Sequence, residues 1–145
     1  MKLSDAIMLG LLEGTTPAFM NIDSCAFGLA LNAEGVPAVD RKSVNIPCTV
    51  SMRYQAINTL WPWTLEDFPQ PVFIKPVIRA FNYQQLIWCW FDYYVYSSGR
   101  PMTMEDLIGV IRLMEPECGE CCQHICQCEK LAAERAEVES ATVTV

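Results

Sequence analysis

The sequence predicts an all-α fold: a compact bundle of four or five short helices around an aromatic core, followed by a cysteine-rich C-terminal helix. Two observations lead to this prediction. Apolar residues recur at three- and four-residue spacing in segments that follow a capping residue and end at glycine or proline. The most aromatic stretch, residues 86–96, carries a single charge, so it should be buried with the helices packed around it.

Three helices are expected in the first half of the chain. Their bounds are 5–13 after a Ser4 cap, 25–34 after a Ser24 cap, and 50–60 after a Thr49 cap. The first is apolar almost all round, which predicts substantial burial. The second carries small residues that let a neighbouring backbone approach closely, and the third shows one buried stripe at helical spacing.

The second half is less regular. A short helix at 65–68 and an extended, proline-limited connector at 71–76 are expected. For residues 77–96, length and the spacing of aromatic and glutamine residues favour a helix, whereas aromatic and β-branched enrichment favours a strand or hairpin. We predict a helix there. Thr103 then caps a further helix over 104–115, with acidic residues in its first turn.

These elements divide the chain into three parts. Residues 1–116 form the helical core domain, 117–139 form a cysteine-rich C-terminal helix or knuckle, and 140–145 form a frayed tail. With 145 residues and 52% hydrophobic content, the chain has enough apolar surface for one folded domain.

Charge and hydropathy exclude several classes of function. The net charge is −7 and the ten basic residues are scattered, which argues against nucleic acid as a partner, because phosphate contacts need clustered Lys and Arg. The aromatic stretch is about half the length of a membrane-spanning helix, so no membrane span is expected. Asp5 and Glu13 interrupt the N-terminal segment where a secretion signal is apolar, which predicts a cytoplasmic protein with reduced thiols.

Three segments carry a resemblance to a known family. They are Met1-Lys2-Leu3-Ser4-Asp5-Ala6-Ile7, Ser24-Cys25-Ala26-Phe27-Gly28-Leu29-Ala30-Leu31 and Thr103-Met104-Glu105-Asp106-Leu107-Ile108 through Glu115, about a third of the chain. This pattern resembles small bacterial and phage proteins in which an opening helix precedes a Ser-Cys-Ala-Leu-Gly-Ala-Ala-Leu helix and a late Trp-Thr-Arg-Glu helix. The family's CxxC pair and His-Leu-Asn-Asp stretch are absent here, where Val95-Tyr96-Ser97-Ser98 stands. The resemblance implies a helical fold and a bacterial or phage origin, and it carries no catalytic residue over.

Residues 118–128 hold five of the eight cysteines and the only histidine. The predicted metal ligands are Cys118, Cys121, Cys126 and Cys128, with Cys122 and His124 as alternates. A C-x-x-C pair with a glycine inside is the spacing of a zinc knuckle, and the C-x-C pair could complete a tetrahedral site of four thiolates. The gap between the two pairs is shorter than in the usual zinc ribbon, and the spacing matches no standard iron–sulfur run.

Packing competes with metal binding as the interpretation of this cluster and is slightly favoured over it. If residues 117–139 form one helix, the cysteines lie on a heptad seam that would dock onto the body or onto a second copy. That seam consists of Cys118, Cys121, Ile125, Cys128 and Ala132. One straight helix cannot surround a metal, so a helical metal site would also need Cys25, Cys48 or Cys89. The even cysteine count would also suit an oxidised disulfide framework.

The leading functional hypothesis is a non-enzymatic binding or regulatory protein of phage type, with a protein partner or a second copy bound through the C-terminal helix. The corner Trp61-Pro62-Trp63 is another candidate contact, although core packing is the favoured interpretation of it. The alternative function is a small metal-binding protein with a structural zinc. No catalytic residue is predicted: Cys25 begins a helix, which would lower its pKa, but no histidine lies nearby in sequence to act as a base.

Overall fold

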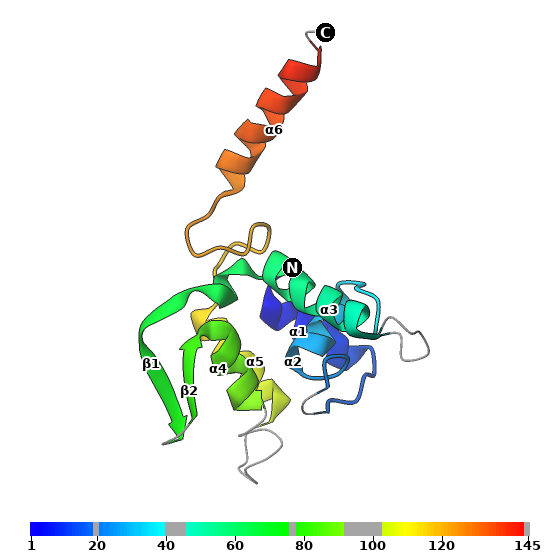
Figure 1. Cartoon of the computed structure of the whole chain (residues 1–145), viewed down its shortest axis with the longest axis vertical. Helices are drawn as coiled ribbons and strands as arrows, with labels where there is room; N and C mark the ends of the chain where they lie inside the picture. Colours follow the sequence, from blue (N-terminus) through cyan, green and yellow to red (C-terminus); the bar gives the residue numbers. More distant parts are fainter. Residues whose placement is uncertain (19–20, 40–45, 76–77, 92–102, 144–145) are drawn as a thin grey trace.

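The protein has a mixed α/β fold, so the all-α prediction is wrong. The structure is a computed structural model that describes residues 1–18, 21–39, 46–75, 78–91 and 103–143. In chain order its elements are α1 (Leu3–Leu12), α2 (Ala26–Ala33), α3 (Ile46–Leu60), the 3-10 helix η1 (Pro62–Leu65), β1 (Asp67–Lys75), β2 (Ile78–Asn82), α4 (Tyr83–Trp90), α5 (Met104–Met114) and α6 (Cys128–Val143). Figure 1 shows a body made of α1 to α5 and the two strands, with α6 standing apart from it.

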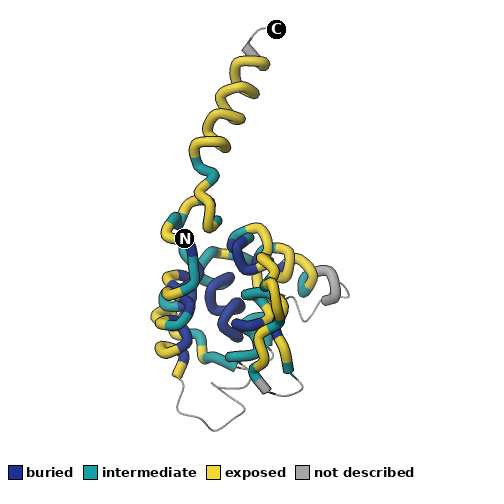
Figure 2. The backbone as a smooth tube through the Cα atoms, turned by 90° about the vertical axis from the view of Figure 1, so that its left-hand side faces the viewer, coloured by how far each residue is buried: buried dark blue, intermediate teal, exposed yellow. Residues whose placement is uncertain are grey.

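The centre of the body is the pair formed by α1 and α2, which make the closest contact between two helices. A side chain at Gly10 would place its Cβ 2.3 Å from the carbonyl oxygen of Leu29, so the two backbones touch where α1 has no side chain. α5 lies against α1 and α3 lies against α2. The most buried backbone accordingly gathers in the middle of the body (Figure 2).

The aromatic residues pack around this pair. Phe27 of α2 contacts the rings of Trp61 and Trp88, with centroids 6.5 and 5.2 Å away. Trp61 and Trp63 are 0% and 1% exposed, which confirms core packing for the Trp-Pro-Trp corner. Of the aromatic stretch expected at 86–96, Leu86, Ile87 and Phe91 are buried and residues 88–90 are half-buried. Residues 92–96 lie outside the described part.

The first two helices begin elsewhere than predicted. α1 starts at Leu3, so Ser4 lies inside its first turn rather than capping it. The Ser4 backbone N–H and hydroxyl both donate hydrogen bonds to the carboxylate of Glu115, which comes from the end of α5. The Glu115 carboxylate, which is distant in sequence, therefore takes the place of a local capping residue at the N-terminal end of α1, where the helix dipole favours negative charge. In α2 the cap is Cys25 rather than Ser24, because its Sγ accepts a hydrogen bond from the Gly28 N–H at 3.4 Å.

α3 begins at Ile46, ahead of the predicted Thr49 cap. Its Arg53 is fully buried and ties the helix to the preceding loops. The guanidinium donates hydrogen bonds to the backbone carbonyls of Ile22, Gly28, Val36 and Pro37 and to Asn32, and its Nε lies 3.3 Å from the Asp23 carboxylate. Burial lowers the pKa of Arg53, and the negative charge of Asp23 opposes that shift.

The hairpin of β1 and β2 is the element that the sequence-based prediction missed. β1 includes residues 71–75 of the segment predicted as a connector, whose last residue lies outside the described part, and β2 lies inside the helix predicted at 77–96. The strands pair antiparallel, with Val72 opposite Ala80, and the register is irregular between Asp67 and Val72, where two prolines fall. A two-stranded sheet consists only of edge strands, and edge strands tolerate proline at such irregularities.

The later helices follow local caps. The Asn82 side chain accepts a hydrogen bond from the Gln85 N–H at 2.9 Å, so the predicted helix exists only from Tyr83 onward, as α4. The predicted short helix at 65–68 is replaced by η1, which ends at Leu65. The Thr103 cap is confirmed, because Thr103 and Asp106 form a reciprocal capping box at the start of α5.

α6 begins at Cys128 and not at residue 117, and it continues to Val143, beyond the predicted end at 139. It makes no substantial contact with any other described helix or strand, and its backbone is exposed along its length (Figures 1 and 2). No helix among the described residues is both long enough and apolar enough to cross a membrane.

Candidate metal centre

Four cysteines meet between the body and α6, and they are the four predicted from the sequence. Their Sγ atoms all lie within 4.8 Å of one another. Cys118 Sγ is 3.5 Å from Cys128 Sγ and 3.7 Å from Cys121 Sγ, and Cys121 Sγ is 3.9 Å from Cys126 Sγ. These separations are far longer than the roughly 2.05 Å of a disulfide bond.

A compact loop brings the four thiols together. Residues 115–127 contain no helix or strand, so the cysteine-rich segment is a loop here and not part of one continuous helix. Cys122 has a φ of +50°, in the left-handed region, and it directly follows the second cysteine of the C-x-x-C pair. From there the loop continues through Cys126 to Cys128, the first residue of α6. Figure 1 shows this loop between α5 and α6.

The loop backbone stabilises negative charge on Cys118. Its pKa is lowered to about 6, chiefly because the backbone N–H groups of Cys121 and Glu120 donate hydrogen bonds to its sulfur. The pKa of Cys128 is raised to about 12, chiefly because its thiol proton is shared with Cys118 and then Cys126. The backbone N–H of Gln127 lies 3.4 Å from Cys121 Sγ. Among the four clustered cysteines, Cys118 therefore loses its proton most readily. Cys128 keeps its proton to a much higher pH.

Cys122, an alternate in the sequence-based prediction, is not part of the cluster. It is 3% exposed, and its Sγ lies 3.5 Å from the backbone oxygens of Met1 and Gly119. Burial raises the pKa of the Cys122 thiol. This side chain belongs to the hydrophobic core, and it anchors the loop against the N-terminus of the chain.

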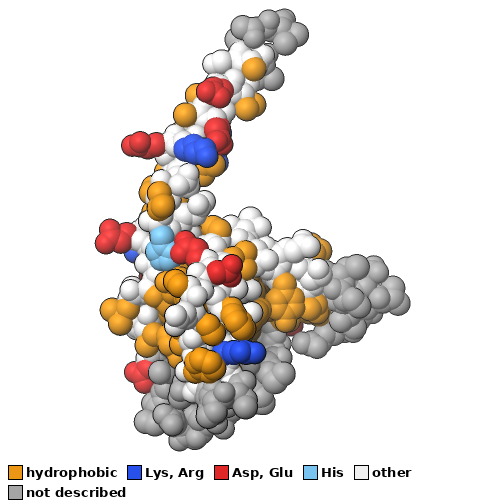
Figure 3. Space-filling model, turned by 60° about the vertical axis from the view of Figure 1, so that its left-hand side comes forward, with side chains coloured by type: hydrophobic (Ala, Val, Ile, Leu, Met, Phe, Trp, Pro, Cys, Tyr) orange, Lys and Arg blue, Asp and Glu red, His pale blue; other side chains and the backbone are white. Residues whose placement is uncertain are grey.

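His124, the other alternate, is also directed elsewhere. Its Nδ1 lies 2.7 Å from a carboxylate oxygen of Glu66, and its Nε2 lies 2.7 Å from the backbone oxygen of Met114. The ring also contacts the rings of Trp63 and Tyr83 at 5.7 and 5.8 Å. In Figure 3 the histidine lies beside acidic side chains where the α6 stalk meets the body. Both ring nitrogens are engaged, so His124 fastens the loop to the body.

The cluster is accessible from solvent. Cys126 is exposed, and Cys118, Cys121 and Cys128 are half-buried. One depression of about 420 Å³ is lined by residues that include Cys118, His124 and Cys126, and a second of about 270 Å³ is lined by Cys121, Cys128 and the start of α6. A metal ion could therefore reach the thiols without any opening of the body.

The heptad seam proposed for the C-terminal cysteines is wrong, because residues 115–127 do not form a helix, although Cys122 alone packs in the core. Ile125, at the centre of the proposed seam, is 78% exposed, and no helix links residue 118 to Cys128. Cys25 caps α2, and Cys89 lies in α4. The side chain of Cys48 lies outside the described part.

Sequence reasoning missed the contacts that hold the loop to the body. Glu66 lies 58 positions before His124, and Glu115 meets Ser4 across 111 positions. The only local hint of the contact between His124 and Glu66 is the presence of a histidine among the cysteines. In the sequence alone that histidine suggests a metal ligand and not a residue that holds the loop to the body. Comparisons with protein-family models, with curated proteins and with solved structures find no match for this chain.

Proposed function

We propose that this protein binds one zinc ion through the thiolates of Cys118, Cys121, Cys126 and Cys128, and that the zinc is structural. The observation that carries the proposal is the spacing of the four sulfurs. Zinc–thiolate bonds of about 2.3 Å in a tetrahedron place neighbouring sulfurs about 3.8 Å apart. Three of the sulfur–sulfur separations are 3.5, 3.7 and 3.9 Å, which bracket that value, and all of the sulfurs lie within 4.8 Å of one another.

Charge supports the same proposal. Four thiolates held within 4.8 Å would repel one another strongly. The pKa of Cys128 is raised because its thiol proton is held by hydrogen bonds with Cys118 and Cys126, so this proton must be displaced before all four sulfurs can bind a metal. A divalent cation bound by all four removes the repulsion and deprotonates each thiol. The N–H groups that face Cys118 and Cys121 would offset part of the remaining negative charge of a zinc–thiolate centre.

The structural role follows from the composition of the loop. Between residues 117 and 127 only Cys122 is buried, so the segment has little hydrophobic core of its own. A metal that joins Cys118 and Cys121 to Cys126 and Cys128 would cross-link the two ends of the loop. It would also fix the start of α6, because Cys128 is the first residue of that helix.

A single tetrahedral ion is favoured over a multinuclear cluster, and we propose zinc as that ion. A tetrahedral site of four sulfurs suits zinc or iron. A multinuclear iron–sulfur cluster is disfavoured because it contains sulfide ions and needs more room than sulfurs 3.5–3.9 Å apart provide. A single ion of zinc fits that separation directly.

The test is elemental analysis of the full chain purified without chelator. One zinc per chain is expected, and protein with neither zinc nor iron at stoichiometric level after zinc addition would overturn the proposal. One iron per chain, visible as colour, would keep the thiolate site and change the metal.

Adjacent cysteines provide a matched control. Cys121→Ser should lower zinc content and weaken zinc binding by at least about tenfold, because a ligand is lost. Cys122→Ser should retain one zinc, because that thiol faces the core; Cys89→Ser is a second control outside the loop. His124→Ala should also retain zinc, since both ring nitrogens bond to the body. Loss of zinc in Cys122→Ser or His124→Ala, with the fold preserved, would contradict the proposed ligand set.

A further inference from the structure

The four clustered thiols form two close pairs, each of which can close a disulfide. Cys118 Sγ lies 3.5 Å from Cys128 Sγ, and Cys121 Sγ lies 3.9 Å from Cys126 Sγ. A disulfide bond is about 2.05 Å long, so the sulfurs of each pair need to approach by only about 1.5–1.9 Å. Both bonds would join the C-x-x-C pair to the C-x-C pair. They would therefore hold the two ends of the loop together, as the proposed zinc does.

The other pairing along the chain is less suitable. Cys118 Sγ is also close to Cys121 Sγ, at 3.7 Å, but that bond would leave Cys126 and Cys128 to pair with each other. Only one residue separates those two, so their disulfide would close a short, strained ring. Neither of these bonds would connect the two ends of the loop. Oxidation of all four thiols therefore favours the pairs 118–128 and 121–126.

An oxidant in solution can reach this cluster before the core thiols. Cys126 is exposed, and it lines the depression of about 420 Å³ together with Cys118. Cys25 and Cys122 are buried, and Cys89 is half-buried in α4. Because oxidation follows the exposure of a thiolate, the clustered cysteines should react first.

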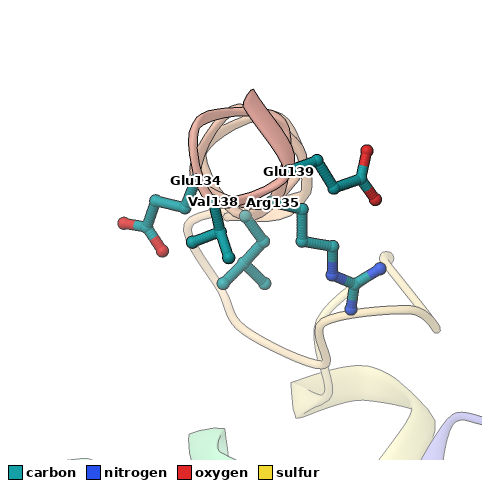
Figure 4. Close-up of a pocket in the computed structure, with 5 residues that line it drawn as sticks. Glu134, Arg135, Val138 and Glu139 are labelled. Atoms are coloured by element: carbon teal, nitrogen blue, oxygen red, sulfur yellow. The ribbon is translucent and has the colours of Figure 1, made fainter. Parts of the chain in front are cut away.

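The helix that follows the cluster offers no competing reactive group. After Cys128, α6 contains neither cysteine nor methionine. The groove of about 310 Å³ along α6 is lined by side chains without sulfur, as Figure 4 shows: Leu131, Glu134, Arg135, Val138 and Glu139. Oxidation in this region is therefore confined to the cluster.

The charge of the depression indicates the class of oxidant. Glu115 and Glu117 line it, and its only basic lining group, His124, is bonded to Glu66. The whole chain carries a net charge of −7. Negative walls repel an anionic oxidant such as glutathione disulfide, whereas a small neutral oxidant such as hydrogen peroxide enters without this penalty.

We propose that hydrogen peroxide oxidises this centre and releases its zinc, with the disulfides Cys121–Cys126 and Cys118–Cys128 taking the place of the metal. The Cys126 thiolate attacks one peroxide oxygen, the O–O bond breaks and hydroxide leaves, which gives a sulfenic acid on Cys126. The Cys121 thiolate then attacks that sulfur, so the S–S bond forms, the S–O bond breaks and a second hydroxide leaves. A second peroxide oxidises Cys118 and Cys128 in the same way.

Electrons and atoms balance in each step. Each disulfide takes two electrons from two thiolates and reduces one peroxide to two hydroxide ions, which become water by taking up two protons. The zinc ion loses all four ligands and leaves as the hydrated ion. Zinc release requires the metal centre proposed above, whereas the pairing of the four thiols does not depend on the metal.

The test is peroxide treatment of the zinc-loaded full chain, after its zinc content has been measured. A chromophoric chelator should detect one zinc released for about two peroxides consumed, at least about tenfold faster than without peroxide. A thiol reductant should restore zinc binding. A chain that holds no zinc before treatment overturns the proposed function, whereas a zinc-loaded chain that keeps its zinc in peroxide overturns only the present inference. Glutathione disulfide at the same concentration should release zinc at least about tenfold more slowly, and equal release would overturn peroxide as the oxidant.

Variants of the metal-free chain test the pairing without zinc. The double variant Cys118→Ser/Cys128→Ser keeps Cys121 and Cys126, which should form a disulfide in peroxide. Cys118→Ser/Cys121→Ser keeps Cys126 and Cys128, and their disulfide should form at least about tenfold more slowly because of the short ring. Peptide mapping by mass spectrometry measures both rates, and equal rates would overturn the assigned pairing.

Cys122→Ser is the matched control in the zinc-loaded chain. Cys122 is next to a proposed ligand but is 3% exposed, so this variant should release zinc at the unchanged rate and form the same two disulfides. Slower release from this variant, or a disulfide that includes Cys122 in the unmodified chain, would contradict the proposed route.

Discussion

Cys121 and Cys122 are neighbours in the chain, but their thiols have different surroundings. Cys121 Sγ lies 3.7 Å from Cys118 Sγ, whereas Cys122 Sγ lies 3.5 Å from the backbone oxygen of Met1. The left-handed backbone at Cys122 turns its side chain into the core while the loop keeps the preceding thiol in the cluster. Cys121 therefore belongs to the candidate metal site, whereas the next residue, Cys122, packs in the hydrophobic core.

The thiols should differ in their reactivity. In the metal-free chain at neutral pH, iodoacetamide should alkylate Cys118 faster than Cys122, because the pKa of Cys118 is lowered to about 6 and that of Cys122 is raised by burial. Mass spectrometry of quenched samples reads the order of labelling. Added zinc should protect Cys118, and alkylation of Cys122 before Cys118 in folded protein would contradict this assignment.

Zinc affinity should increase with pH. Zinc binds thiolates, and the pKa of Cys128 is raised to about 12, so at neutral pH the metal must displace the Cys128 proton. Below about pH 6 it must displace the Cys118 proton as well, so the loss of affinity should steepen there. Competition with a chromophoric chelator, corrected for the chelator's own protonation, measures this dependence. An affinity that is flat across this range would exclude thiol ligands.

Two helical glycines should respond oppositely to alanine. Gly10→Ala should reduce the free energy of unfolding by about 1–3 kcal/mol, because the new Cβ would lie 2.3 Å from the Leu29 carbonyl oxygen and force α1 away from α2. Gly109→Ala in α5 meets nothing within 4 Å and should stabilise by about 0.5–1 kcal/mol through lower backbone entropy of the unfolded chain. Urea denaturation compares both, and an equal effect at the two sites would argue against the close α1–α2 contact.

Arg53 should be among the most sensitive polar positions. Arg53→Met should cost about 3–5 kcal/mol of unfolding free energy, because it leaves the Asp23 charge and several buried carbonyl oxygens without their donor. Arg112→Met is the control: that side chain is half exposed and lies 3.7 Å from Asp5, so its loss should change stability by less than about 1 kcal/mol. Thermal or chemical denaturation of both variants distinguishes them. Equal stability of the two would contradict the role assigned to Arg53.

Some of the fold follows from residues that are close in sequence. Thr103 and Asp106 are three positions apart, so the capping box that begins α5 was predictable from the chain alone. Asn82 carries a similar signal for α4, but the helical spacing of the residues around it led to a helix that began too early. The four cysteines could be chosen from their spacing because all of them fall within residues 118–128, where one tight loop can bring their thiols together.

Other features depend on contacts between distant segments. Antiparallel pairing of β1 with β2 turned a proline-rich connector into a strand, because the ladder hydrogen bonds come from the partner strand and not from local propensity. Glu115 displaced Ser4 as the group that satisfies the start of α1, and Glu66 with Met114 removed His124 from the candidate ligands.

The sequence by itself therefore determined the capped helix that begins at Met104 and the identity of the clustered thiols, since both depend on side chains that are close to one another in the chain. Only the tertiary structure decided the mixed fold, the roles of Cys122 and His124, and the separation of α6 from the body. The physical reason is that a helix cap or a metal knuckle is closed by local geometry. A strand pair or a buried anchor is defined by what the rest of the chain places beside it.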